Sequence, residues 1–136
     1  MTAAVALLRG INVGGNKKVP MAELRRVLES LGCTNVRTLL NSGNAVFTAP
    51  RSSTRGLARG IEGALAKHFG FEVRVVVHTA SELNVIIAEN PLPRATLDAS
   101  RFLVAFADSP KDVAKTRPLT SQSWGREQLA LGRHAA

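Results

Sequence analysis

The chain is poor in cysteine and in aromatic residues. Its 136 residues include one cysteine, no tyrosine, one tryptophan and five phenylalanines. The single Cys33 excludes an internal disulfide, which fits a reducing compartment. No apolar run approaches the roughly 20 residues that span a bilayer, and residues 1–9 lack the features of a secretory signal. These absences lead us to expect a cytoplasmic protein with no membrane association.

Acidic residues are scarce in the first part of the chain. Residues 1–78 contain 11 Lys or Arg against 4 Asp or Glu, whereas the remainder contains 7 against 6, within an overall net charge of +8. A basic half attracts nucleic acid, phosphorylated metabolites or acidic proteins, although charge of this size also serves solubility. Proteins that bind single strands usually stack bases on aromatic side chains, which are few here. Nucleic acid is therefore compatible with the charge but is not indicated by a motif.

Hydrophobic periodicity predicts five elements in residues 1–78: a strand, a helix, a hairpin, a helix and a strand. The expected segments are 3–8, 20–31, 36–40 with 45–48, 52–69 and 71–78. Gly56, Gly60 and Gly63 weaken the prediction of the second helix. The order is that of a ferredoxin-like βαββαβ unit, in which two helices cover one face of an antiparallel sheet.

Residues 79–136 predict a second unit that is incomplete. Thr79 and Glu82 match a capping box for a helix that ends before Pro91, and residues 79–100 then form this helix and a connector containing proline. Residues 101–136 predict a strand over 101–107, a helix opened by Pro110 after Ser109 as cap, and a strand over 128–131. We therefore predict an α+β protein that forms one compact domain. Its second unit is either truncated or completed by a partner, and an exposed sheet edge would allow a homodimer to form.

The stretch "LLRGINVGGNKKVP" places a glycine loop between the first strand and the first helix. It is not a P-loop, since Asn16 stands where the motif needs Lys followed by Ser or Thr, and its glycines do not match G-x-G-x-x-G. Backbone N–H groups near a helix N-terminus, with two lysines alongside, favour a phosphate or carboxylate. A plain glycine turn with solvated lysines is the alternative.

The hairpin tip at 41–44 offers two amides and a hydroxyl, which would join the same site if the two loops lie close together. The candidate residues of this hypothetical small-anion site are Arg9, Gly10, Asn12, Gly14, Gly15, Asn16, Lys17, Lys18, Asn41, Ser42, Gly43 and Asn44. Two other classes stay open. One is an interaction module that docks nucleic acid or an acidic protein on a basic face of Arg51, Arg55, Arg59 and Lys67, and the other is an enzyme with unidentified catalytic groups.

Catalytic, metal and cofactor signals are weak. Ser42 has no evident base, because His68 lies in a helix pattern, His78 ends a strand and His134 lies near the end of the chain. Cys33 and the histidines lack the spacing of metal ligands, and no motif calls for a cofactor. The sequence therefore names no catalytic residue.

Residues 7–47, "LLRGINVGGNKKVPMAELRRVLESLGCTNVRTLLNSGNAVF", closely resemble the N-terminal signature of the domain of unknown function 1697 family. The combination of R-G-I-N-V-G-G, M-A-E-L and S-G-N at these separations carries the resemblance, with "ENPLP" and "RFLVAF" as looser matches. The resemblance implies a small bacterial α+β protein with no settled activity. Leu39 and Cys33 stand where aromatics are common in the family, and Ala45 where a larger aliphatic is usual. Family members also usually continue past Ala136.

Overall fold

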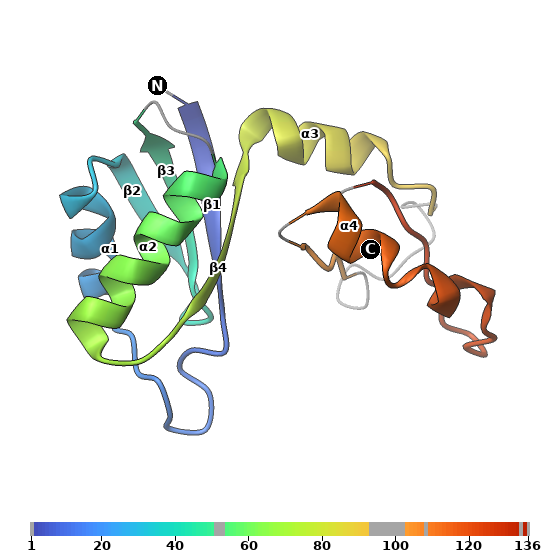
Figure 1. Ribbon diagram of the computed structural model, residues 1–136, viewed down its shortest axis with the longest axis horizontal. Helices are drawn as coiled ribbons and strands as arrows, with labels where there is room; N and C mark the ends of the chain where they lie inside the picture. The colour runs from blue at the N-terminus through green and yellow to red at the C-terminus, as the bar shows by residue number, and fades with distance from the viewer. Residues whose placement is uncertain (1, 51–53, 93–102, 108, 134, 136) are drawn as a thin grey trace. The chain divides into compact units, whose positions relative to one another are not determined.

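The computed structural model describes residues 2–50, 54–92, 103–107, 109–133 and 135 of two units, Met1–Ala80 and Ser81–Ala136 (Figure 1). The elements of the first unit are β1 (Thr2–Arg9), α1 (Met21–Ser30), β2 (Thr34–Leu39), β3 (Asn44–Ala49), α2 (Thr54–Phe69) and β4 (Arg74–Thr79). The next helix, α3 (Ala80–Ala88), leads into the second unit, which also contains α4 (Pro110–Ala114) and the 3₁₀ helix η2 (Arg117–Ser121). The predicted α+β class is confirmed.

The four strands form one antiparallel sheet in the order β2-β3-β1-β4. β1 lies in the interior of the sheet and pairs with β3 and β4, with Ala6 opposite Ala45 on one side and Val77 on the other. The predicted hairpin is confirmed as β2 and β3, which pair from Leu39 and Asn44 outward. Strand β1 thus delivers the glycine loop to the same end of the sheet as this hairpin's turn.

One face of the sheet forms the core of the first unit. Alternate residues of β1 are buried, as period-2 geometry requires, and their cross-strand neighbours are buried with them. The two helices contact each other and pack on β2 and β4 respectively. The fully buried side chains with the largest volumes in this core are Phe47, Ile11, Leu24, Leu28, Ile61, Leu65, Val19 and Val75.

The helices follow their predicted amphipathic patterns. α1 buries Leu24, Val27 and Leu28, and the chain leaves it through Gly32 at φ +87°, a conformation that suits glycine. α2 remains helical through Gly60 and Gly63 because Ile61 and Leu65 are fully buried against the sheet. Burial of its apolar face outweighs the helix propensity that the glycines remove.

The second unit departs from the predicted strands. Within its described residues, the β-type pairing consists of one isolated antiparallel bridge between Phe106 and Ala135. The prediction of a strand over 128–131 is wrong. Of the strand predicted over 101–107, only Phe106 takes part in a bridge, and residues 101–102 lie outside the described residues. Most of the expected connector lies outside them as well. An apolar run forms a strand only when another strand supplies its hydrogen bonds.

The helix predicted after Ser109 is confirmed as α4. The Ser109 side chain accepts a hydrogen bond from the Asp112 backbone N–H at 3.4 Å, and Pro110 occupies the first turn, where its missing N–H costs nothing. Helix α3 likewise follows β4 closely and ends before Pro91. In the described part of the chain, no helix is long and apolar enough to cross a bilayer.

Candidate functional site

The glycine loop folds as a small hairpin of its own. Asn16 donates its backbone N–H to the Val13 carbonyl at 3.1 Å, and Asn12 donates to the Lys17 carbonyl at 3.1 Å. Gly14 and Gly15 form the turn between them at φ +60° and +77°, the paired positive values of a type I′ turn. The two glycines are therefore explained by the turn, and α1 begins only at Met21.

Asn12 holds this hairpin in place. Its Nδ2 donates to the Val19 carbonyl at 2.9 Å and to the Asn41 carbonyl at 2.7 Å, while its Oδ1 accepts from the Val19 N–H at 2.8 Å. The side chain thereby ties the glycine loop to the segment that enters α1 and to the tip of the β2–β3 hairpin. The proximity of the two predicted loops is a feature of the structure.

Gly43 brings the hairpin tip against the core. Its carbonyl accepts from the Leu8 N–H at 2.8 Å, and a Cβ atom at Gly43 would lie 2.7 Å from Ile11 Cδ1 and 2.8 Å from Leu8 Cβ. The residue also has φ +96°. Glycine is required at this position by close packing as well as by backbone conformation.

A cavity of about 360 Å³ lies where the two loops meet, which we call the loop cavity. Its lining residues are Asn12, Gly15, Lys18, Val19, Pro20 and Asn41. Four of these belong to the predicted site, and Lys18 is the charged one. Pro20 is the N-cap of α1 and provides no side-chain cap, so the first turn of α1 begins at the edge of the cavity.

Other predicted residues lie outside the loop cavity. Lys17 Nζ donates to the Glu72 carbonyl at 2.9 Å, and Arg9 lies opposite Arg74 on β4. Asn44 Nδ2 lies 3.0 Å from Ser42 Oγ and 3.3 Å from the Leu39 carbonyl oxygen, so these polar groups satisfy one another at the hairpin tip. Gly10, at φ +70°, turns the chain out of β1.

Ser42, the nucleophile considered from the sequence, is not paired with a histidine in the described structure. Ser42 Oγ accepts from Asn44, and His68 Nε2 lies 3.3 Å from Glu23 Oε2 on the helical side of the sheet. Burial raises the pKa of the Cys33 thiol, which disfavours the reactive thiolate. Among the described His, Cys, Asp and Glu side chains, no group of three lies together as metal ligands.

The predicted basic face is divided by an acidic residue. Arg55, Arg59 and Lys67 are exposed on α2, and Arg55 and Arg59 lie one turn apart. Glu62 follows Arg59 by three residues, so a carboxylate shares their helix face. Arg51 lies outside the described residues.

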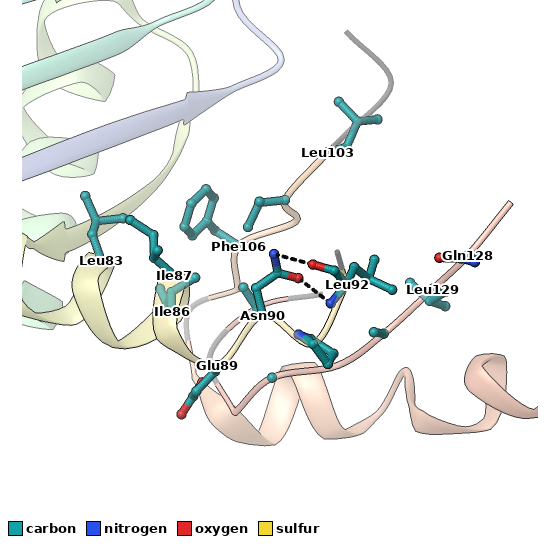
Figure 2. Close-up of a pocket in the computed structure, with 15 residues that line it drawn as sticks. Leu83, Ile86, Ile87, Glu89, Asn90, Leu92, Leu103, Phe106, Gln128 and Leu129 are labelled. Carbon is teal, nitrogen blue, oxygen red and sulfur yellow. Dashed lines mark hydrogen bonds between the residues drawn. The ribbon is translucent and has the colours of Figure 1, made fainter. Parts of the chain in front are cut away.

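The second unit contains an apolar cavity that was not predicted from the sequence. The cavity has a volume of about 240 Å³, and Figure 2 draws its lining, including Leu83, Ile86 and Ile87 from α3 and Phe106. The polar side chains beside the cavity form hydrogen bonds with backbone groups. Asn90 exchanges hydrogen bonds with the Leu92 backbone at 3.0 and 3.3 Å, and Glu89 Oε2 accepts from the Arg133 backbone N–H at 2.9 Å. The signal that could have indicated it is the apolar run over residues 85–88, at the end of α3.

Comparisons with known proteins agree with this architecture. The structure of the conserved bacterial protein SP0830 from Streptococcus pneumoniae is similar with a TM-score of 0.78 and 33% sequence identity, over 99% of this chain and 74% of that one. A search of curated proteins found no match. The model of the protein family of unknown function DUF1697 matches residues 1–136. By its sequence and by its solved relative, the chain belongs to the DUF1697 family of proteins of unknown function.

Proposed function

We propose that the first unit binds a small anionic ligand, carrying phosphate or carboxylate, in the loop cavity. The main support for this proposal is that the glycine loop and the hairpin tip line one cavity together. Asn12 Nδ2 joins them by donating to the Asn41 carbonyl at 2.7 Å. Its volume of about 360 Å³ is within the range of small-molecule sites.

The charge at the loop cavity favours an anion. Lys18 lines it, and no Asp or Glu is among the lining residues. The backbone N–H groups of Met21 and Ala22, at the start of α1, have no hydrogen-bond partner in the described structure. Such groups carry the positive end of the helix dipole, which attracts negative charge. Lys18 and the start of α1 would together hold one anionic group.

Thermal unfolding tests this proposal. Orthophosphate, pyrophosphate, citrate and nucleotides should be added singly at low and at moderate salt, because a ligand that binds only the folded state raises the melting temperature. At 100 times its Kd, a ligand adds about 2.7 kcal/mol to the free energy of unfolding, which is a shift of several degrees. We expect Lys18→Ala to abolish the shift and Lys111→Ala, an exposed lysine of the second unit, to preserve it. A shift that survives Lys18→Ala would refute the site.

A macromolecular partner is the second candidate function. Arg55 and Arg59 project from neighbouring turns of α2, and Arg51 and Lys67 extend the basic face in sequence. Nucleic acid bound there would show a steep loss of affinity with salt, because phosphate contacts release counterions. Salt-independent binding would contradict this candidate. An enzyme with catalytic groups yet to be identified is a third candidate.

We also infer a ferredoxin-like βαββαβ arrangement for the first unit, supported by the antiparallel strand order β2-β3-β1-β4 and by two helices packed on one sheet face. The free, buried Cys33 supports a cytoplasmic location. The outer edges of β2 and β4 are the places where a second copy could add a strand. Sedimentation of the protein over a range of concentrations would test this dimer.

A further inference from the structure

The sheet face opposite α1 and α2 has a different character from the core face, and we call it the open face. Strand alternation assigns to it Val5, Leu7 and Arg9 of β1, Arg37 and Leu39 of β2, Asn44 and Val46 of β3, and Arg74, Val76 and His78 of β4. Leu39 is 57% exposed and Val46 41% exposed, although His78 is buried. Within the described first unit, both helices that pack on the sheet lie on the other face.

The open face places two arginines directly opposite each other. Arg9 and Arg74 are register partners in the antiparallel pair β1–β4, and both are exposed. Side chains at such positions lie close together, and like charges there destabilise the sheet. Neither guanidinium has an ion-pair partner in the described structure.

A third cation lies at the same corner. Lys17 reaches the Glu72 carbonyl at 2.9 Å, two residues before Arg74, and it holds a left-handed backbone conformation at φ +47°. Such a backbone is costly for a residue other than glycine. Three cations therefore lie at this corner, where the exposed Glu72 contributes one carboxylate.

We infer that the open face is a docking surface for an acidic amphipathic helix of a partner protein. Carboxylates of the helix would bind the corner of Arg9, Arg74 and Lys17, and its apolar side would cover the exposed Leu39 and Val46. Charge complementarity supports this occupant, because the charged side chains that strand alternation assigns to the face are three arginines, Arg9, Arg37 and Arg74. The site is distinct from the loop cavity and from Lys18.

Nucleic acid fits the open face less well. Binding of single strands relies on aromatic side chains for base stacking. The residues assigned to this face are aliphatic, apart from the charged and polar groups and the buried His78, and Phe47 points into the opposite core. An aliphatic surface bordered by arginines suits the apolar stripe and the carboxylates of a helix better than it suits bases.

The dimensions of the face set the spacing of acids on the helix. Arg37 of β2 is the register partner of Val46 on β3, and Val46 is in turn the partner of Val5 on β1. Arg9 therefore lies two strands from Arg37 and four residues further along β1. With about 4.8 Å between strands and about 3.4 Å per residue, the two Cα positions are roughly 17 Å apart. An α-helix rises about 1.5 Å per residue, so carboxylates roughly 11 residues apart would reach both ends of the face.

The experiment measures binding and stability together on the full chain. The probe is a labelled 18-residue peptide with leucines on one helical stripe and glutamates 11 residues apart, followed by fluorescence anisotropy at low salt. We expect R74E to weaken peptide binding by about tenfold or more, since it reverses a charge at the docking corner. The same substitution should raise the melting temperature of the protein alone by roughly 1–4 °C, because it replaces a repulsive cross-strand pair with an attractive one.

Matched controls separate a local effect from a general change in charge. R59E, on α2, changes the net charge equally and should leave peptide binding within about twofold. A peptide with its leucines and glutamates scrambled should bind at least about tenfold more weakly, because it cannot present both sets on one stripe.

Four outcomes would overturn the inference. Two concern the peptide: no binding to the unaltered protein at 1 mM, roughly the weak limit of specific affinities, or equal losses of peptide affinity with R74E and R59E. The other two are a lower melting temperature for R74E, and an oligonucleotide that binds more tightly than the peptide and is sensitive to R74E. Self-association that is abolished by R74E would instead assign the face to a second copy. Because Lys18→Ala leaves the open face unchanged, the loop cavity and this surface fail or succeed separately.

Discussion

The two units use similar apolar sequence to different effect. In the first unit, one buried cluster extends from Ala4 to Val77 and joins four paired strands to two helices. In the described part of the second unit, Ile86, Val113 and Ala135 are buried, whereas Leu103 is 85% exposed. Apolar content alone does not make a core, because strands and helices bury their faces only when other elements cover them.

The comparison assigns most of the folding stability to the first unit. A sheet whose interior strands are paired on both sides protects its backbone, whereas the second unit has an isolated bridge in its described residues. The first unit also contains the loop cavity, held in place by Asn12. We therefore expect perturbations of the first unit to change global folding and those of the second to act locally.

Native-state hydrogen exchange should show the largest difference between the units. Amides of β1 and β3 open only with global unfolding, so they should exchange more slowly than those of residues 122–133 by a factor of about 1,000 or more, equivalent to about 4 kcal/mol. Mass spectrometry of peptides from the intact chain would measure this. Equal protection of both segments would mean that the second unit folds as cooperatively as the first.

A matched pair of isoleucines should sharpen the comparison. Ile61 in α2 is 0% exposed and Ile86 in α3 is 8% exposed. We expect Ile61→Ala to reduce the free energy of unfolding by about 2–5 kcal/mol, since it opens a cavity in a close-packed core. Ile86→Ala should cost less than about 2 kcal/mol, because it enlarges an existing apolar cavity that it already lines. Chemical denaturation of both variants measures the difference, and a larger loss for Ile86→Ala would contradict it.

Two glycines in the first unit should respond differently to an added methyl group. Gly43→Ala should destabilise the fold by roughly 2–4 kcal/mol, because the Cβ meets Leu8 and Ile11 and the backbone has positive φ. Gly14→Ala has the positive φ without the clash and should cost about 1–2 kcal/mol. Thermal and denaturant unfolding would compare them. Equal losses would show that backbone strain alone requires Gly43.

Cys33 should give the smallest effect, visible only at high pH. Burial raises the pKa of this thiol above 9.0 in the folded state, so the folded protein retains the proton after the unfolded chain has lost it. The resulting stabilisation is complete below pH 9 and is lost as the pH rises through the folded-state pKa, by at most about 1.4 kcal/mol per pH unit. Cys33→Ala should remove this dependence. Parallel stability profiles of the two proteins above pH 9 would contradict it.

Local sequence patterns predicted most of the first unit. The period of apolar residues located α1, α2 and the strands, and the Asn41–Asn44 turn located the hairpin. The same patterns failed over residues 128–131, where no partner strand pairs with the apolar run in the described structure. Pairing depends on residues distant in the chain, which a local pattern does not contain.

The candidate site was predicted only in outline. The sequence grouped Arg9, Lys17 and Lys18 with the hairpin tip, but the structure separates them. Lys18 lies at the loop cavity, whereas Lys17 turns to the Glu72 carbonyl and Arg9 faces Arg74. The register of β1 against β4 decides the last of these, and a shift of one residue would place the two arginines on opposite faces of the sheet.

By itself, the sequence determined the family, the α+β class, the amphipathic elements and the turns, because each of these depends on residues within a few positions of one another. Only the tertiary structure decided that Asn12 joins two loops, that Gly43 packs on Leu8, and that Arg9 and Arg74 meet on an open sheet face. These contacts join residues 29, 35 and 65 positions apart. Strand order and register create them, and both are set by the packing of the whole unit.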